Sequence, residues 1–159
     1  MRVLVTGSTG LVGSALVPFL AAGGHTVSRL VRDGGGEHDP SWRPQSDEID
    51  EKALAGFDAV IHLAGESIAE GRWTAQKKAR IRDSRVRGTR LLSGALARSS
   101  APPKVLVCAS AIGFYGDRGD LVCDESAIPG TGFLPEVCVA WESATESCLL
   151  YTSPSPRDS

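Results

Sequence analysis

Three glycines near the start of the chain have the spacing of a phosphate-binding turn. Gly7, Gly10 and Gly13 follow the apolar run 3–5 and precede residues 11–20, whose apolar positions recur every three or four residues. This order predicts a buried strand, a tight turn and a helix. Glycines let a pyrophosphate approach the backbone, and the unpaired N–H groups of a helix start attract its charge. The turn therefore predicts a dinucleotide site, with a purely structural glycine turn as the alternative.

Two hydroxyl-bearing residues follow a later apolar run, residues 105–109, and could face a substrate. They are Ser110 and Tyr115. Polar groups at the carboxyl end of a buried parallel strand lie in the crevice where ligands bind. We take both as candidate catalytic residues. The alternative is that Tyr115 serves packing and Ser110 caps a turn.

The pattern of apolar and turn residues predicts the elements that must position these groups. Further strands are expected at 26–31, 57–63 and 105–109, with helices at 11–20, 47–54, 75–98 and 130–145 and loops at 34–46 and 117–129. Alternating strands and helices predict an α/β fold, a Rossmann-type doubly wound parallel sheet in three α/β/α layers. We expect Trp42, in the first loop, to cover an edge of the core.

The end of the second strand decides which dinucleotide is preferred, because that position meets the adenosine ribose. Arg32 follows Val31 there, and Arg29 is near. A guanidinium suits the 2′-phosphate of NADP, whereas an acidic residue would select NAD. The sequence therefore favours NADP. Asp33 keeps NAD open, and either arginine could be a solvated surface charge.

The third strand ends in His62 and the small residues Ala64 and Gly65, which permit close approach of a ligand. His62 stands inside an apolar strand, which favours a packed, hydrogen-bonded histidine over an acid or base. Basic residues crowd the long helix at 75–98 and mostly form a solvated face. Among them, Arg80 and Arg85 could reach a cofactor or an anionic substrate.

The composition is that of an ordinary single domain. The chain has 159 residues, 42% hydrophobic and 23% charged, with a net charge of −2. We therefore expect a small-molecule substrate and no nucleic-acid or membrane partner, with the oligomeric state left open. The four scattered cysteines predict thiols in a reducing cytoplasm and no metal site, and no signal peptide is expected.

Several short motifs together resemble one family. They are Thr-Gly-Ser-Thr-Gly-Leu-Val-Gly at 6–13, His-Leu-Ala-Gly-Glu-Ser at 62–67, Arg-Trp at 72–73, Ser-Arg at 84–85, Ser-Ala-Ile-Gly-Phe-Tyr-Gly at 110–116, and Phe-Leu-Pro-Glu-Val-Cys at 133–138 followed by Trp-Glu at 141–142. They resemble the atypical extended short-chain dehydrogenases/reductases, the NAD-dependent epimerase/dehydratase-like "epimerase family" proteins. The glycine motif is shared by many Rossmann enzymes, but the others are more specific.

The resemblance implies that residues 1–147 are an NADP-binding Rossmann domain of an epimerase/dehydratase-like oxidoreductase. It implies that the pyrophosphate is bound by Gly7, Thr9, Gly10, Leu11, Val12 and Gly13. It also implies contacts of Arg32 with the 2′-phosphate and of Leu63, Ala64 and Gly65 along the cofactor. Arg80 and Arg85 are further candidates.

The catalytic pattern of the wider superfamily is absent at the positions that correspond. That pattern is a Ser with a Tyr-x-x-x-Lys pair, in which Tyr transfers the proton and Lys lowers its pKa. The Tyr position falls at Leu134, the Lys position at Cys138 and the Ser position at Ala111. This departure supports an alternative function, a non-catalytic dinucleotide-binding or redox-sensing module.

Residues 148–159 depart from the family pattern, which continues into another strand and a substrate-binding half. They are Ser/Pro-rich at their end, and we interpret them as a non-native tail. The Rossmann sheet is then expected to be incomplete at its C-terminal side, with an open edge. A third interpretation follows, an inactive truncated fragment without a stable fold.

Overall fold

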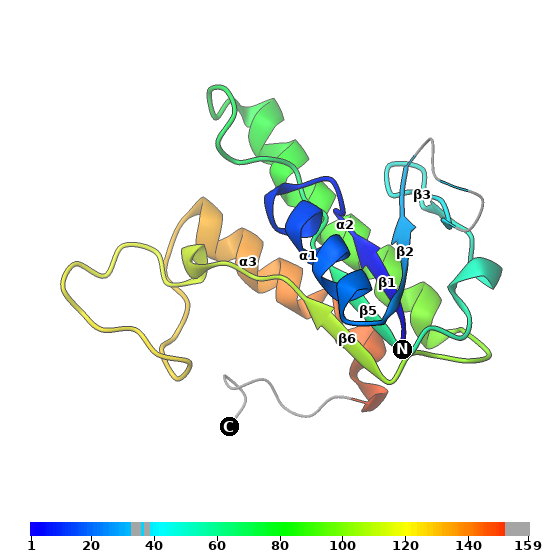
Figure 1. Ribbon diagram of the computed structural model, residues 1–159. Helices are drawn as coiled ribbons and strands as arrows, with labels where there is room; N and C mark the ends of the chain where they lie inside the picture. Colours follow the sequence, from blue (N-terminus) through cyan, green and yellow to red (C-terminus); the bar gives the residue numbers. More distant parts are fainter. Residues whose placement is uncertain (33–35, 37–38, 152–159) are drawn as a thin grey trace.

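The computed structural model describes residues 1–32, 36 and 39–151, and it is built on a parallel sheet with helices on both faces (Figure 1). The four strands of this sheet are β1 (Arg2–Thr6), β2 (Thr26–Leu30), β5 (Ala59–His62) and β6 (Val105–Cys108), in the order β2-β1-β5-β6. The helices are α1 (Leu11–Ala22), α2 (Ala75–Ala97) and α3 (Phe133–Ser143). The predicted α/β Rossmann-type fold is confirmed.

Helices α2 and α3 close one face of the sheet, which we call the closed face. Leu4 of β1 and Val60 of β5 point to this face and pack with Leu92 and Leu96 of α2, all of them buried. α3 packs on α2, and its indole Trp141 Nε1 donates to Thr89 Oγ1 of α2 at 2.9 Å. Right-handed parallel crossovers require successive helices of this kind on the same face.

Among the described residues, helix α1 is the one helix on the other face, which we call the half-open face. Val3 and Val5 of β1 point to it and are buried under Val17 and Leu20 of α1. The period of two in a strand puts alternate residues on opposite faces, and both core clusters follow that alternation. Helix α1 contacts β1 and β2. At the other edge of the sheet, Figure 1 shows β6 with no helix in front of it.

The segment after β2 differs from the sequence prediction. Residues 42–49 form a small antiparallel hairpin of β3 (Trp42–Arg43) and β4 (Glu48–Ile49), and the predicted helix at 47–54 is reduced to the 3₁₀ turn η1 (Lys52–Leu54). The prediction of a helix there was wrong because burial of Trp42 and the pairing of Trp42 with Ile49 override local helix propensity. A positive φ of 55° at Asp47 makes the turn.

Trp42 does more than cover an edge of the core. Its indole is buried, stands edge-on to the His62 ring with centroids 5.9 Å apart, and lies against Gly88 of α2. A Cβ at Gly88 would come within 3.4 Å of the indole, so the small residue admits the large ring. Ser41, beside it, forms a parallel bridge with Val31 and so extends the sheet past β2.

The other 3₁₀ turns are η2 (Ile112–Phe114), beyond β6, and η3 (Glu146–Tyr151), after α3. Cys148 of η3 packs against the closed-face core, and its thiol donates to the Ser93 carbonyl at 3.0 Å. The last residues of the predicted tail, 152–159, lie outside the described residues. No helix of the described part of the chain is both long and apolar enough to cross a membrane.

Candidate dinucleotide site

The glycine turn, residues 7–13, has the backbone geometry that its spacing predicts. Gly7 has φ +66°, which favours glycine, and its carbonyl accepts the Gly10 N–H at 3.0 Å. A Cβ at Gly13 would lie 2.2 Å from the Gly7 oxygen, so the first helical turn can pack here only without a side chain. Gly10 is the N-cap of α1, in extended conformation and without a side-chain cap.

The start of α1 is open to solvent. Leu11 is 93% exposed and Val12 61% exposed, and Thr9 and Gly10 are exposed as well. The first N–H groups of a helix have no partner within it, and among the described residues no side chain caps them or lies within 4 Å of a Cβ placed at Gly10. The turn therefore fits the diphosphate of a dinucleotide, which these N–H groups and the helix dipole would hold.

The end of β5 lies directly behind the glycine turn. A Cβ at Gly7 would be 2.7 Å from the carbonyl carbon of Leu63 and 2.8 Å from the nitrogen of Ala64. Thr6 fixes this approach, because its hydroxyl oxygen accepts the N–H groups of Leu63 and Ala64, each at 3.1 Å. The structure thus places the start of the glycine turn against the backbone of Leu63 and Ala64.

His62 is a structural histidine, as predicted. It is buried, its Nδ1 lies 2.6 Å from Thr6 Oγ1, and its Nε2 lies 2.9 Å from Thr89 Oγ1. Burial lowers the pKa of His62 to about 4. The imidazole is therefore neutral at physiological pH and points away from solvent, which does not suit an acid or base.

Arg85 and Arg80 hold the loop that follows β5. Arg85 is half-buried, its Nη1 donates to the carbonyl of Glu66 at 3.0 Å, and its guanidinium stacks 5.1 Å from the Trp141 ring. The same guanidinium lies against Gly65, where a Cβ would come within 3.2 Å of it. Arg80 reaches the Glu66 carboxylate at 3.5 Å. Both arginines thus shape the 64–66 segment next to the predicted cofactor path.

Glu66 is the centre of a small ion-pair cluster. Lys77 Nζ lies 2.8 Å from Glu66 Oε1, and the Lys77 side chain is only 6% exposed. The hydrogen bond from Lys77 is the main reason that the pKa of Glu66 lies below its usual value. The Glu66 N–H also donates to Ser84 Oγ at 3.0 Å. Glu66 therefore carries its charge within the loop and anchors it to α2.

At the end of β2, the structure distinguishes two arginines. Arg29 forms an ion pair with Asp39 at 2.7 Å, and the Arg29 N–H also donates to that carboxylate. These bonds to Arg29, and one from the Gly36 N–H, hold the pKa of Asp39 below its usual value against the opposing effect of burial. Arg32 is exposed one residue beyond the bridge at Val31. Asp33, the acidic alternative, lies outside the described residues.

The predicted catalytic residues lie beyond β6. Ser110 is exposed, and its hydroxyl donates to the Glu142 carboxylate of α3 in a short hydrogen bond. Tyr115 is partly buried; its ring stands edge-on to Phe114 at 5.4 Å, and its carbonyl accepts from Arg118 Nε at 3.0 Å. The structure therefore orients Ser110 through a carboxylate and fixes the backbone of Tyr115.

Leu134 and Cys138, which the motifs align with the Tyr and Lys of the missing pair, lie against the residues that follow β6. A Cβ at Gly113 would be 3.3 Å from Leu134 Cβ and 3.9 Å from Cys138 Sγ. The Cys138 thiol also lies 3.8 Å from the Ala111 carbonyl. Leu134 and Cys138, the positions that the sequence motifs assign to that pair, thus lie together against the turn beyond β6.

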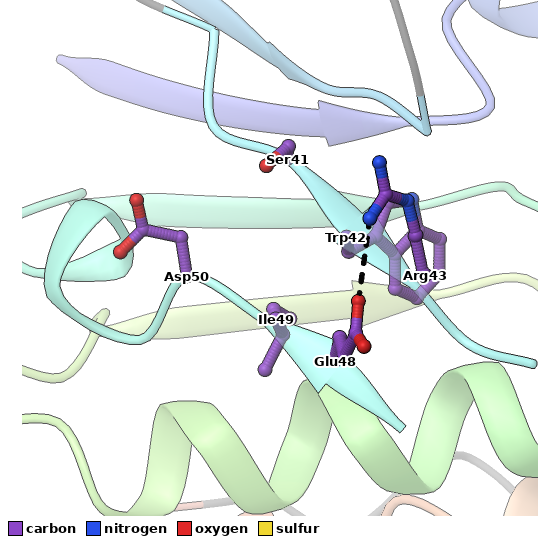
Figure 2. A pocket seen from close by; sticks show the side chains of 6 residues that line it. All are labelled: Ser41, Trp42, Arg43, Glu48, Ile49 and Asp50. Atoms are coloured by element: carbon purple, nitrogen blue, oxygen red, sulfur yellow. Dashed lines mark hydrogen bonds and ion pairs between the residues drawn. The ribbon is translucent and has the colours of Figure 1, made fainter. Parts of the chain in front are cut away.

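A hollow of about 180 Å³ lies beside the β3–β4 hairpin. Figure 2 shows its lining side chains, with Arg43 and Glu48 paired at 3.5 Å across the hairpin and Asp50 at the far end. The Asp50 N–H closes the loop by donating to the Ser41 carbonyl at 3.2 Å. The hollow is open, and we assign it no role.

Sequence reasoning missed four residues of the site: Thr6, Glu66, Thr89 and Glu142. Thr6 and Glu66 fall inside the recognised motifs, and their positions next to Gly7 and Gly65 were the available signal. Glu142 also falls inside a recognised motif, Trp-Glu at 141–142, but its contact with Ser110 became visible only when α3 was placed on the sheet. Thr89 became visible only when α2 was placed there. Their partners lie 27 residues away for Thr89 and 32 residues away for Glu142.

A parallel sheet in this order, with a glycine turn between β1 and α1 backed by the end of β5, defines a dinucleotide-binding domain of the Rossmann type. The comparisons with known proteins agree. Residues 3–133 match the NAD dependent epimerase/dehydratase family. The chain belongs to this family.

Relatives and solved structures extend this result. The Epimerase family protein Mb2239 of Mycobacterium bovis is 46% identical over 144 residues, which are 90% of this chain and 47% of the relative. A nucleoside-diphosphate sugar epimerase structure from Corynebacterium glutamicum is similar, with a TM-score of 0.81, 38% identity and coverage of 95% of this chain and 31% of the other. The human epimerase family protein SDR39U1, solved with NADPH, has a TM-score of 0.79, 30% identity, and coverage of 91% and 48%.

The coverage has a consequence for the fold. The chain spans about half the length of the curated relatives that it matches. The prediction of a Rossmann-type sheet that is incomplete at its C-terminal side is confirmed, and β6 is the strand at which the described sheet stops.

Proposed function

We propose that this chain is the NADP(H)-binding part of an epimerase/dehydratase-like oxidoreductase that acts on a small molecule. The observation that carries the proposal is the open glycine turn, whose N–H groups at the start of α1 are exposed above the Leu63–Ala64 backbone. In this proposal the diphosphate lies on residues 9–13. The 63–65 segment lies along the cofactor, with Arg80 and Arg85 behind it. In this proposal, the net charge of −2 favours no nucleic-acid or membrane partner, and the four cysteine thiols favour a cytoplasmic location.

NADP is the proposed cofactor, and Arg32 is the proposed contact of its 2′-phosphate. Arg29 is engaged with Asp39, whereas Arg32 is exposed at the strand end where the adenosine ribose would lie. The human relative solved with NADPH supports this choice. The description of the family names NAD, so the preference between the two is the property to measure.

Ser110 and Tyr115 are the proposed substrate-facing residues. A nicotinamide bound here would supply hydride transfer. Because the Ser110 hydroxyl donates its proton to Glu142, its oxygen lone pairs remain to accept a hydrogen bond from a substrate hydroxyl. Glu142 would thereby orient the serine, and Tyr115 would border the same strand end.

The test is a titration of the 159-residue chain with NADPH and with NADH, followed by nicotinamide fluorescence. Wild type is expected to bind NADPH more tightly, and preference for NADH would overturn the role of Arg32. Gly10→Ala is expected to weaken NADPH binding by at least roughly tenfold, because a methyl group would stand where the diphosphate approaches.

A matched glycine provides the control. Gly23 lies at the other end of α1 with the same φ of −75°, and a Cβ there would be 3.3 Å from the nearest backbone oxygen, as at Gly10. Gly23→Ala should bind NADPH as wild type does. Equal losses in the two variants, or no binding by wild type, would contradict the proposed function.

A non-catalytic dinucleotide-binding module is the second candidate. Leu134 and Cys138, packed against Gly113, support it because neither can transfer a proton as the Tyr–Lys pair does. Turnover separates the two candidates. A full-length relative that binds NADPH and never oxidises it with carbonyl or sugar-nucleotide substrates would favour the module.

A further inference from the structure

A buried chain of hydrogen bonds links α3 to the backbone behind the glycine turn. It runs from Trp141 through Thr89 and His62 to Thr6, with distances of 2.9, 2.9 and 2.6 Å. Within the described part of the chain, every buried side-chain nitrogen or oxygen has a hydrogen-bond partner. Each member belongs to a different element: α3, α2, β5 and β1.

The number of available protons fixes which group donates and which accepts in each bond of this series. Thr6 Oγ1 already accepts two backbone N–H groups, so its own proton is directed to His62 Nδ1. His62 then carries its ring proton on Nε2 and donates it to Thr89 Oγ1. Thr89 Oγ1 therefore accepts from both His62 and the Trp141 indole, and the Cys108 thiol lies within hydrogen-bonding reach of Thr89 and Trp141.

At its Thr6 end, the series of hydrogen bonds reaches the backbone that would face the proposed ligand. The two N–H groups that Thr6 accepts belong to Leu63 and Ala64, whose backbone lies against Gly7. The other end is α3, one residue before Glu142, which holds Ser110. Thr89 therefore lies between the proposed cofactor segment and the proposed substrate-facing serine.

We propose that Thr89 is a positioning residue that couples α3 to the Leu63–Ala64 backbone and, through it, to dinucleotide affinity. The affinity part rests on the proposed function, whereas the coupling itself does not. Thr89→Val keeps the shape of the side chain and leaves two buried N–H donors, His62 Nε2 and Trp141 Nε1, without their acceptor. The imidazole then loses the bond that fixes its orientation, and Thr6 loses a fixed partner.

The control is Ser93, one turn further along α2. Its hydroxyl is also buried and also binds α3, donating to the Ala144 carbonyl at 2.7 Å. The same hydroxyl lies 2.8 Å from the backbone carbonyl of Thr89, so Ser93→Ala removes bonds to the backbone of α2 and α3 and leaves the side-chain bonds of Thr89, His62 and Trp141 in place. Thr89→Ser restores the acceptor and serves as the rescue.

The experiment compares the amide ¹H–¹⁵N shifts of Leu63 and Ala64, the ring nitrogens of His62 and the Kd for NADPH in these variants. In wild type, the His62 spectrum should show a proton on Nε2. Thr89→Val should move both amides, perturb the His62 ring signals and raise the Kd roughly tenfold. Ser93→Ala and Thr89→Ser should leave the amides near their wild-type positions and the Kd within about twofold.

Unchanged amides in Thr89→Val, or equal changes in Ser93→Ala, would overturn the coupling. Should Thr89→Val fail to fold, Trp141→Phe decides, because it removes one donor and keeps an aromatic ring beside Arg85. It should shift the same two amides, and no shift would overturn the coupling. Absence of NADPH binding by wild type would refute the proposed function, and the amide shifts would still decide the coupling.

Discussion

The two faces of the sheet are built from the same strands, but helices cover the closed face more completely than the half-open face. On the closed face, Leu4, Val60 and His62 lie under α2 and α3 with 1% exposure or less. On the half-open face, Val105 and Val107 of β6 are 48% and 50% exposed. The apolar side chains form one row across neighbouring strands, because Val107 is in register with Ile61, which is in register with Val5. The apolar pattern thus runs across the whole sheet, while α1 covers only its first strands.

This difference separates the proposed cofactor segment, which a buried core supports, from the proposed substrate side, which is more exposed. The closed face anchors the Thr6–His62 bonds and the 64–66 loop, so the backbone that would line a dinucleotide rests on a sealed core. The half-open face ends at β6, beside Ser110 and Tyr115. Burial of a whole valine side chain is worth roughly 1.5–3 kcal/mol, and β6 realises only part of that in this chain.

The first prediction compares one large side chain from each face. Leu92→Ala, in the closed-face core, should lower the free energy of unfolding by roughly 4 kcal/mol, because it leaves a cavity. Phe19→Ala, on α1 with its ring 74% exposed, should lower it by less than about 1 kcal/mol. Urea denaturation followed by circular dichroism measures both. Similar losses would remove the distinction between the faces.

The second prediction uses the pH dependence of the closed face. His62 has a pKa of about 4 in the folded chain and about 6.5 when unfolded, so between these values the unfolded state binds more protons. Stability is therefore complete above pH 6.5 and falls as the pH is lowered toward 4, by about 3 kcal/mol from this residue.

Urea unfolding at several pH values, in wild type and in His62→Gln, isolates this contribution from that of the carboxylates. The variant should be less stable at pH 7 and should lose less stability on acidification. A wild-type curve that is flat between pH 6.5 and 4.5 would contradict a neutral, buried imidazole.

The sequence predicted those elements whose structure depends on residues close to one another along the chain. The glycine turn, the four parallel strands and helix α2 follow from spacing, because 3.6- and 2-residue periods and glycine positions are local properties. The packed state of His62 followed from the apolar strand around it. The roles assigned to Arg32, Ser110 and Tyr115 stay predictions.

Contacts between distant segments could not be predicted in the same way. The hairpin at 42–49 replaced the expected helix because Trp42 reaches His62 and Gly88, which lie 20 and 46 positions further along the chain. Phe19 fits a helical apolar stripe, yet it is mostly exposed, and Val17 and Leu20 are the residues of α1 that pack on the sheet. Thr89, and the contact of Glu142 with Ser110, entered the site through tertiary packing alone.

The last prediction compares the two faces with one valine from each of two adjacent strands, β5 and β6. Val60 of β5 is fully buried on the closed face, and Val107 of β6 is half-exposed on the other. Replacing valine by threonine keeps the shape and adds one hydroxyl, which must lose its hydration only where the site is sealed. Val60→Thr should therefore lower the free energy of unfolding by about 2 kcal/mol, and Val107→Thr should change it by less than about 0.5 kcal/mol. A large loss in Val107→Thr would mean that β6 is covered in solution, for example by a second copy of the chain, and sedimentation of the two variants would then differ with concentration.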